Sequence, residues 1–232
     1  MTTGITCDNI AYQYPGATTK VFQGLSFRIA EPGFNALFGP SGVGKTSLAK
    51  IIVGEIAGFS GDVNADGMTR LLYSYNMERL PDWSSVGKHL DRIAASSAGD
   101  HKEDLVEAFG MANYLGLRFS QLSLGQQNRI NLMRYLLQEF ELLIMDESLA
   151  NVDEKTRESI ILKIKAMFPD RYFLYISHNV VEVSKYCREI LVLRGVLKQP
   201  QTVSLMGIDI QSHQPLDKDR LELTMLEIMN AS

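Results

Sequence analysis

Residues 39–47, GPSGVGKTS, have the residue types and spacing of a phosphate-binding loop. Gly39 is followed by four residues and then by Gly44, Lys45 and Thr46, which matches the pattern G-x-x-x-x-G-K-[ST]. Glycines let successive backbone N–H groups converge on phosphate oxygens, and the N-terminus of the next helix adds partial positive charge. We predict a nucleoside triphosphate site formed by Gly39, Pro40, Ser41, Gly42, Val43, Gly44, Lys45, Thr46 and Ser47.

Lys45 and Thr46 have the side chains that phosphate chemistry requires within this loop. We expect the Lys45 ammonium to reach the β- and γ-phosphates and to serve catalysis, and the Thr46 hydroxyl to bind Mg²⁺. A glycine turn that only joins a strand to a helix is the alternative interpretation. Such a turn has no need of a Lys–Thr pair, so the sequence favours the nucleotide site.

A pair of acids follows the apolar run LLIM about a hundred residues later, at Asp146 and Glu147. A buried strand would place Asp146 at its carboxyl end, beside the phosphate loop, where ligands of open α/β sheets collect. Asp146 is then expected to hold Mg²⁺ through water, and Glu147 to act as the general base on the attacking water. An Asp–Glu pair alone often only begins a turn, but the phosphate loop upstream favours the catalytic interpretation.

The elements that must position these residues follow from the hydrophobic pattern. Strand-like runs alternate with amphipathic helical runs, which predicts an α/β fold with a P-loop NTPase core and a mainly parallel sheet. Residues 5–29 alternate apolar and polar, which predicts an N-terminal antiparallel β subdomain. The stretch GFSGDVNADGM is turn-rich. We predict a nucleotide-binding domain over residues 1–205, with a helical subdomain inserted at about 76–125, and a helical tail over 206–232.

The composition of the chain argues against several classes of function. The chain has 232 residues and a net charge of −4, which gives no sign of the basic face that nucleic-acid binding needs. No run approaches the ~20 apolar residues of a membrane span, and the N-terminus lacks the features of a signal peptide. We therefore expect a cytosolic chain in which Cys7 and Cys187 are reduced, buried thiols.

The segment QLSLGQQNR, residues 121–129, carries a resemblance to a known family. Ser123, Gly125 and Gln126 match the signature L-S-G-G-Q of the ATP-binding cassette (ABC) ATPases, while Leu124 replaces the first signature glycine. Ser123 could be only a helix cap, but a cap does not require Gly125 and Gln126. The resemblance implies that these residues act in trans, over the γ-phosphate of ATP held by the other subunit of a head-to-tail dimer.

Other residues are similar to family positions over about residues 3–205. Tyr14 matches the aromatic residue that stacks on adenine, with Tyr12 as the alternative. His178, in YISHN, matches the catalytic histidine that contacts the γ-phosphate, and Asp153 matches the aspartate of the D-loop, residues 150–153. Asn76 falls where the family has a glutamine that reaches Mg²⁺ and the attacking water. Because Asn is one methylene shorter than Gln, we expect it to act on the metal through a water, with a closer approach of the loop as the other possibility. The alternative is that Asn76 is a plain turn residue.

The segment RLPDWSSVGKHL resembles a segment of ATPases that serve nitrate, sulfonate and taurine importers. This resemblance implies a peripheral subunit on the inner face of the cell membrane that hydrolyses ATP with Mg²⁺. Its expected partners are a second copy or a paralogue, transmembrane permease subunits and, indirectly, an extracytoplasmic solute-binding protein, but no nucleic acid. Trp83 could also be an ordinary packing aromatic. The alternative function is a soluble or lipid-handling ABC ATPase that serves cluster assembly or lipid extraction.

Overall fold

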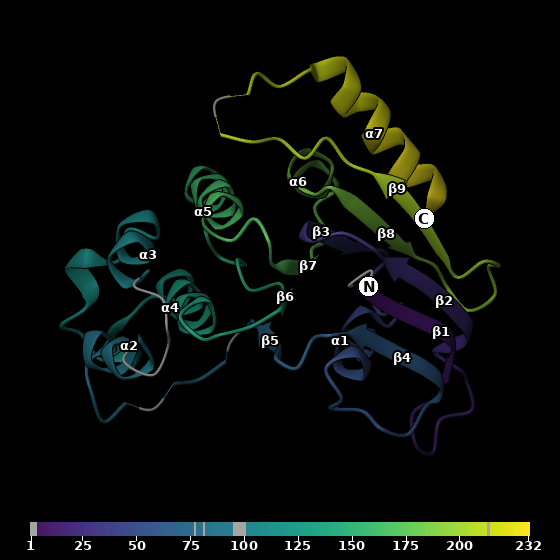
Figure 1. Ribbon diagram of the computed structural model, residues 1–232, viewed down its shortest axis with the longest axis horizontal. Coiled ribbons are helices and arrows are strands. Elements are labelled where there is room, and N and C mark those ends of the chain that lie inside the picture. The colour runs from purple at the N-terminus through teal and green to yellow at the C-terminus, as the bar shows by residue number, and fades with distance from the viewer. Residues whose placement is uncertain (1–3, 77, 81, 95–100, 213) are drawn as a thin grey trace.

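The computed structural model describes residues 4–76, 78–80, 82–94, 101–212 and 214–232, which form two sheets and the helices that cover them (Figure 1). A three-stranded sheet has the order β2-β1-β4, and a six-stranded sheet has the order β5-β6-β7-β3-β8-β9. No helix among these residues is long and apolar enough to cross a bilayer.

The smaller sheet is antiparallel, as the N-terminal alternation predicts. It consists of β1 (Gly4–Tyr12), β2 (Phe22–Ile29) and β4 (Ser60–Asp66), and β1 pairs with both neighbours. The third strand corrects the interpretation of GFSGDVNADGM as turn-rich. Gly61 lies inside β4, where a Cβ atom would sit 2.4 Å from the carbonyl oxygen of Asn9. This glycine therefore allows two backbones to approach within a sheet and does not mark a turn.

The larger sheet is mainly parallel, which confirms the predicted α/β class. Strands β3 (Gly33–Phe38), β5 (Leu71–Tyr75), β6 (Leu142–Asp146), β7 (Tyr172–Ile176) and β8 (Glu189–Leu193) run in parallel, and β9 (Thr202–Met206) is the antiparallel edge. Both faces of β6 and β7 are buried, which explains their continuous apolar sequences. The carboxyl ends of β3, β5, β6 and β7 lie at one edge, where the candidate functional residues follow.

Helices cover both faces of this sheet (Figure 1). They are α1 (Lys45–Ile52), α2 (Val86–Ala94), α3 (Lys102–Ala108), α4 (Leu124–Leu136), α5 (Glu154–Met167), α6 (Val180–Tyr186) and α7 (Lys218–Ala231), with 3₁₀ turns at Ala112–Tyr114 and Phe119–Gln121. The helix predicted in the tail corresponds to α7. The sequence reading overlooked α6, a short helix that Asn179 caps by accepting from the N–H groups of Val181 and Glu182. The division into domains stays a prediction.

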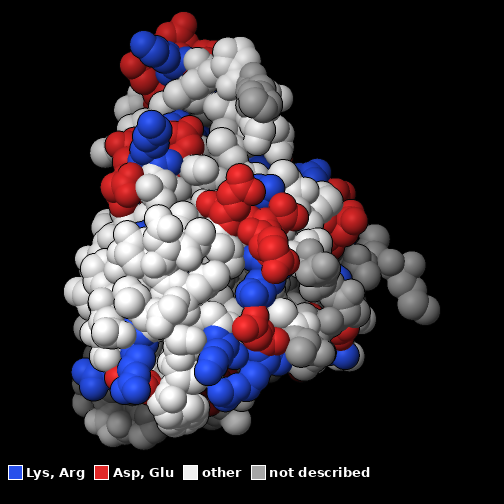
Figure 2. Space-filling view, turned by 90° about the vertical axis from the view of Figure 1, so that its left-hand side faces the viewer, with Lys and Arg blue, Asp and Glu red and all other residues white. Residues whose placement is uncertain are grey.

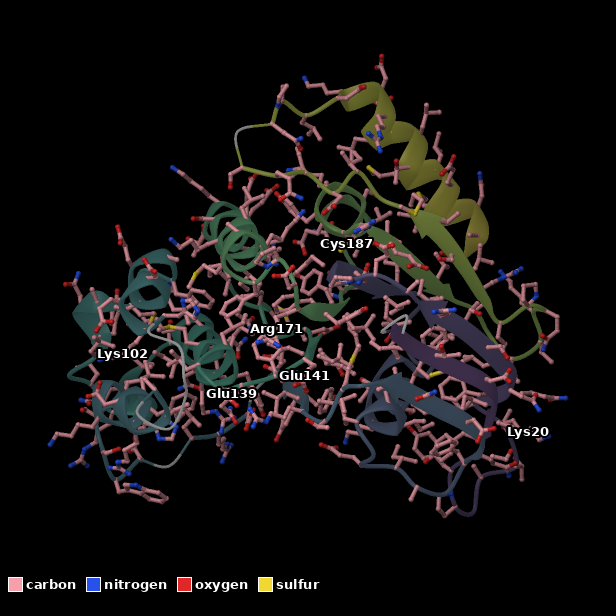
Figure 3. The ribbon with its side chains drawn as sticks, in the orientation of Figure 1. Lys20, Lys102, Glu139, Glu141, Arg171 and Cys187 are labelled. Carbon is pink, nitrogen blue, oxygen red and sulfur yellow. The ribbon has the colours of Figure 1, made fainter. Side chains whose placement is uncertain are left out.

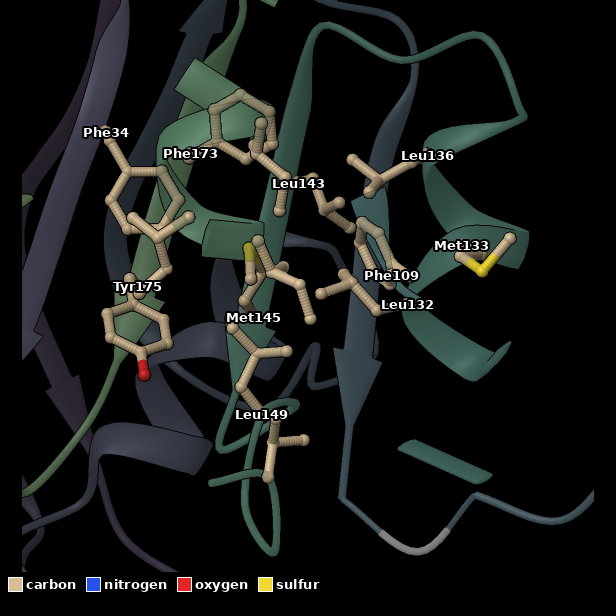
Figure 4. Close-up of a cluster of buried hydrophobic side chains, with 14 of the residues drawn as sticks. Phe34, Phe109, Leu132, Met133, Leu136, Leu143, Met145, Leu149, Phe173 and Tyr175 are labelled. Atoms are coloured by element: carbon tan, nitrogen blue, oxygen red, sulfur yellow. The ribbon is translucent and has the colours of Figure 1, made fainter. Parts of the chain in front are cut away.

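The core holds strand β6 from both faces. Leu143 and Met145 point toward α4 and the helical region, where they pack with Leu132 and Phe109 (Figure 4). The alternate residues of the strand pack on the other face, with α1 and the smaller sheet. Truncating a leucine in such a core costs about 2–5 kcal/mol. This packing fixes the position at which β6 presents Asp146.

Candidate nucleotide site

The phosphate loop has a backbone conformation that only glycine accommodates well. Gly39 has φ 154°, and a Cβ atom there would lie 2.4 Å from the carbonyl oxygen of Leu193. Gly44, with φ 109°, precedes α1 without a side-chain cap. The first N–H groups of α1 are therefore not engaged by a capping side chain, as expected of a helix N-terminus that receives an anion.

The side chain of Lys45 folds back over the loop. Its Nζ donates to the carbonyl oxygens of Gly39, at 2.7 Å, and of Pro40, at 2.9 Å. Partial burial lowers the pKa of Lys45, although the nearby carboxylates of Glu147 and Asp146 act in the opposite direction. The loop thus holds this ammonium in a fixed place at the mouth of the site.

Asp146 accepts two hydrogen bonds on one carboxylate oxygen. Thr46 Oγ1 donates to Asp146 Oδ2 at 2.7 Å, and the Tyr73 hydroxyl donates to the same atom at 2.8 Å. Burial, followed by the contact with Asp146, raises the pKa of Tyr73, so the phenol stays a neutral donor. Strand β5 lies beside β6 in the sheet and supplies Tyr73.

Glu147 is brought to the same edge by an unusual backbone conformation. It has φ 50°, and its N–H donates to the carbonyl oxygen of Ile176 at the end of β7. Its carboxylate lies 3.2 Å from His178 Nδ1, and the histidine is largely exposed. The structure thus brings together two residues that the sequence placed separately in catalysis.

A cavity of about 640 Å³ joins most of the predicted residues, at a size that suits a nucleotide. Predicted residues in its lining are Tyr14, Ser41, Gly42, Gly44, Lys45, Thr46, Ser47, Asn76, Asp146 and Glu147. The lining also contains four residues that the sequence analysis did not predict, Lys50, Glu55, Tyr73 and Tyr75. The alternation of β5 places both tyrosines on one face, and this signal could have revealed them.

Tyr14 rather than Tyr12 faces this cavity. Tyr14 is 50% exposed and its hydroxyl bonds to Ser47, whereas Tyr12 is 7% exposed and packs edge-on against Tyr14. The aromatic face available to a ligand therefore belongs to Tyr14.

Asn76 follows β5 and is held at both its backbone and its side chain. Its N–H donates to the carbonyl oxygen of Asp146 at 3.1 Å, and its Oδ1 accepts from Asn128 Nδ2 at 2.9 Å. The residue also lines the cavity together with Thr46 and Asp146, and its contact with a metal stays a prediction.

Ser123, Gly125 and Gln126 lie outside the cavity lining, at the start of α4. Ser123 caps α4, and Gln126 Oε1 accepts from the Ser123 N–H at 2.8 Å, which completes a capping box. A Cβ atom on Gly125 would lie 2.3 Å from the carbonyl oxygen of Asn151. Gln126 thus takes part in the cap, and Gly125 allows the close approach of the backbone at Asn151, so both residues have a role within this chain as well.

The D-loop, which follows Glu147, packs against the start of α4. Asn151 has φ 62°, and Asp153 caps α5 by accepting from the Thr156 N–H at 3.0 Å. This hydrogen bond holds the pKa of Asp153 below its usual range. The D-loop is thus fixed between the start of α4 and the start of α5.

Another hollow, of about 690 Å³, lies where β6 and β7 begin, at the opposite edge of the sheet. Its charged residues include Glu139, Glu141 and Arg171 (Figure 3). Arg70 forms an ion pair with Glu139, and Glu141 Oε2 accepts from the backbone N–H groups of Thr69 and Arg70. These partners make a structural role the simplest explanation of its carboxylates, so the hollow is not a second candidate for the nucleotide.

The cavity, its phosphate loop and its acid pair match the resemblance seen in the sequence, and a family model described as "ABC transporter" matches residues 22–150, more than half of the chain. The chain belongs to the ABC transporter family. ABC proteins of this kind are ATPases coupled to transport, and this ABC chain is accordingly a transport-coupled ATPase that binds ATP.

Several relatives are ATP-binding subunits of transport systems. The chain is 26% identical to the taurine import ATP-binding protein TauB of Ruegeria pomeroyi, over 82% of this chain and 77% of the relative. It is 30% identical to the zinc transport system ATP-binding protein TroB of Treponema pallidum, over 72% and 70%. The molybdenum import ATP-binding protein ModC of Saccharophagus degradans is also 30% identical, over 72% of this ABC chain but 51% of its own length.

Solved structures share the fold. A bacterial Atm1-family ABC exporter with ATP bound has a TM-score of 0.74 and 20% identity, over 98% of this chain and 41% of the exporter chain. A metal-chelate type ABC transporter in an inward-facing conformation has a TM-score of 0.70 and 17% identity, over 88% and 83%. At these identities the likeness supports the ABC fold alone.

Proposed function

We propose that this chain is the ATP-hydrolysing subunit of an importer of a small solute, with a sulfonate-like or other anionic compound as the expected class. The observation that carries the proposal is the convergence of Lys45, Thr46, Asp146 and Glu147 on one cavity. The taurine and molybdenum relatives are both named for import, and the taurine relative matches most of this chain. The segment around Trp83 supports the same class.

The residues of the site fit Mg²⁺ together with ATP. Mg²⁺ prefers hard oxygen ligands and is usually held by one or two carboxylates together with substrate phosphates. Thr46 Oγ1 and Asp146 Oδ2, which lie 2.7 Å apart, are oxygen donors of this kind at the end of the phosphate loop. Bound there, Mg²⁺ would neutralise charge on the β- and γ-phosphates.

Glu147 and His178 have the geometry for the hydrolytic step. Water attacks the γ-phosphorus, the bond to the bridging oxygen breaks, and Glu147 takes the proton from the water. His178, 3.2 Å from Glu147, orients this carboxylate and lies exposed, where it can reach the γ-phosphate of ATP. Tyr14 would stack on the adenine ring.

The residues at the start of α4 are proposed to serve the site of a second subunit. Ser123 and Leu124 are exposed, although Ser123 and Gln126 also complete a local cap. Such a helix start can face the γ-phosphate of a partner in a head-to-tail dimer. The partner subunit would be a second copy or a paralogue.

A permease is the proposed membrane partner. Trp83 is 73% exposed. Residues that precede it in the sequence help to line a hollow of about 400 Å³, whose lining is Arg79, Leu80, Asp82, Phe119, Ser120, Leu124 and Gln127. Seen from the side of α2 and α3, the surface has a broad uncharged area between mixed acidic and basic groups (Figure 2). A short helix of a permease fits a partly apolar hollow of this kind. The chain would then be peripheral on the inner face of the membrane, and a solute-binding protein would act through the permease.

Copurification from detergent-solubilised membranes of the source cells tests this proposal. We expect the tagged chain to retain a protein with several membrane spans, and we expect ATP hydrolysis by the complex to rise with the imported solute. Trp83→Glu should weaken this retention, while Trp83→Phe should preserve it. Recovery of the chain only with soluble assembly factors or lipid-handling proteins would overturn the import proposal.

A further inference from the structure

Gln201 joins the two sheets through its side-chain amide, directly before β9. It is 2% exposed, and its Oε1 accepts from the backbone N–H of Gln23 at 2.7 Å. Its Nε2 donates to the carbonyl oxygens of Val21, at 3.2 Å, and Arg194, at 3.4 Å. Val21 and Gln23 flank the first residue of β2 in the smaller sheet, whereas Arg194 follows β8 in the larger sheet. One buried side chain thus holds the start of β2 against the end of β8.

The partners of this amide fix its orientation. Backbone carbonyls only accept hydrogen bonds, so the nitrogen of Gln201 must face Val21 and Arg194. A backbone N–H only donates, so the oxygen of the amide must face Gln23. The main chain adds a further contact, because the Gln201 carbonyl oxygen accepts from the Arg194 N–H at 2.8 Å. A hydrocarbon side chain of the same length could make none of the three side-chain contacts.

The phosphate loop lies between the two segments that this amide joins. We call these segments the walls of the loop, residues 21–23 and 193–194. A Cβ atom on Gly39, the first glycine of the loop, would lie 2.4 Å from the carbonyl oxygen of Leu193. A Cβ atom on Gly44, the last glycine, would lie 2.6 Å from Val21 Cγ1. The loop backbone therefore contacts one wall at each of its ends, and the spacing of the walls determines the space in which the loop is held.

We propose that Gln201 is a positioning residue for nucleotide binding, which fixes the spacing of the walls and thereby the conformation of the phosphate loop. Among the described residues that line the nucleotide cavity, Gln201 does not occur, so it acts through the loop and not on the ligand. A loop that is already held in its binding conformation loses less conformational freedom when a ligand binds, and this increases affinity. The inference rests on the proposed phosphate site at residues 39–47.

Gln201→Met tests this role because it keeps the length of the side chain and removes the amide. We expect the affinity for ATP, measured by calorimetry on the folded variant, to fall about tenfold, the size expected for the loss of one or two neutral hydrogen bonds. KM should rise while kcat at saturating ATP changes little, because uniform binding is lost. The affinity for GTP should fall by the same factor, since the loop contacts only phosphates. A loss confined to ATP would place the effect at the base, near Tyr14, and overturn the proposal.

Thr202→Val is the matched control. Thr202 follows Gln201 directly, and its Oγ1 donates to the carbonyl oxygen of Ser26 at 2.7 Å, so it also joins β9 to β2. Ser26 lies further along β2 than the walls of the loop. The control should therefore bind ATP like the wild type, even if it loses some stability. A loss of affinity as large as that of Gln201→Met would attribute the effect to the attachment of β9 in general.

Two hydrogen bonds of the loop report its conformation without any nucleotide. The Val43 N–H donates to the carbonyl oxygen of Pro40 at 3.4 Å, and the Leu48 N–H donates to that of Gly44 at 2.9 Å. Hydrogen exchange of these two N–H groups, measured by nuclear magnetic resonance, should become about tenfold faster in Gln201→Met, because local opening costs less free energy. Exchange at the wild-type rate in this variant would contradict a role in positioning the loop.

Gln201→Asn keeps the amide on a shorter side chain, and both its ATP affinity and its exchange rates should fall between those of the wild type and Gln201→Met. If Gln201→Met does not fold, Gln201→Asn is compared with Thr202→Val by the same two measurements, and values equal to the control would overturn the proposal. ATP binding by the wild type and its loss in Lys45→Ala test the phosphate site separately. Failure there would overturn the proposed site, whereas the exchange measurement would still decide whether Gln201 holds the loop.

Discussion

Tyr73 and Asp146 lie on neighbouring parallel strands, two residues apart in register, and the tyrosine hydroxyl donates a 2.8 Å hydrogen bond to the aspartate carboxylate. The carboxylate is thereby oriented from the sheet before any ligand binds. Removing a hydrogen bond that orients a metal ligand typically lowers the metal affinity about 10–100-fold.

Tyr73→Phe should therefore raise the Mg²⁺ concentration required for half-maximal ATP hydrolysis about tenfold, while ATP binding without metal changes little. A Mg²⁺ titration of turnover measures this effect. Tyr175→Phe is the control, since it removes a similar buried bond, 2.9 Å long, to Glu182. Equal Mg²⁺ requirements in both variants would contradict the role of Tyr73.

Glu147→Gln should retain ATP binding and lose turnover by about 10²–10⁴-fold, because the amide cannot accept the proton from water. We expect the variant to accumulate as an ATP-bound dimer in gel filtration. Phosphate release close to the wild-type rate would show that another group is the base.

Ser123→Arg should leave ATP binding to the monomer nearly intact and abolish hydrolysis, which requires the dimer. Because Ser123 also caps α4, Ser123→Ala is needed as a control, and it should cost only about 1 kcal/mol of unfolding free energy. If Ser123→Arg lost ATP binding as completely as Lys45→Ala, the assignment to the partner's site would be wrong.

Gly125→Ala should destabilise the fold by about 1–3 kcal/mol, because its Cβ atom would lie 2.3 Å from a backbone oxygen. Within a helix the same exchange normally stabilises by up to ~1 kcal/mol, so the sign itself is informative. Chemical denaturation measures it. Gly116→Ala is the control, since among the described residues no heavy atom other than those of Gly116 and its two chain neighbours lies within 4 Å of the added Cβ.

The stability of the fold should decrease at alkaline pH through Cys7. Burial raises the pKa of the Cys7 thiol to about 12, whereas an unfolded thiol ionises near ~8.5. Between these values the unfolded chain binds fewer protons, so the free energy of unfolding falls as pH rises. Denaturation at pH 8 and pH 10 should show a smaller decrease in Cys7→Ala than in the wild type.

Local sequence patterns predicted those features that depend on nearby residues. The phosphate loop, the buried strand before Asp146 and the helix in the tail all follow from spacing and periodicity. Strand β4 was missed because Gly61 suggests a turn, and its actual role depends on the backbone of β1. The spacing S-x-x-Q also indicates a capping box, but the sequence analysis considered a cap for Ser123 alone and assigned Gln126 to the family motif.

The contacts that could not be predicted join residues far apart in the chain. Tyr73 is 73 positions from Asp146, and Asn76 is 52 positions from Asn128. A strand tyrosine and a helical asparagine are ordinary residues in their own elements. Their contacts with Asp146 and Asn76 arise only because β5 pairs with β6 and α4 packs beside β5.

The length of α4 has a mechanical consequence. Its thirteen residues correspond to a rod of about 20 Å, with the proposed trans-acting residues at its tip and Asn128 one turn behind them. A rod of this kind transmits displacement rather than absorbing it. If the nucleotide of a partner binds at this tip, as proposed above, a displacement of α4 would also move Asn128 and, through its 2.9 Å hydrogen bond, Asn76 at the nucleotide cavity, so nucleotide binding in one subunit would affect the site of the other.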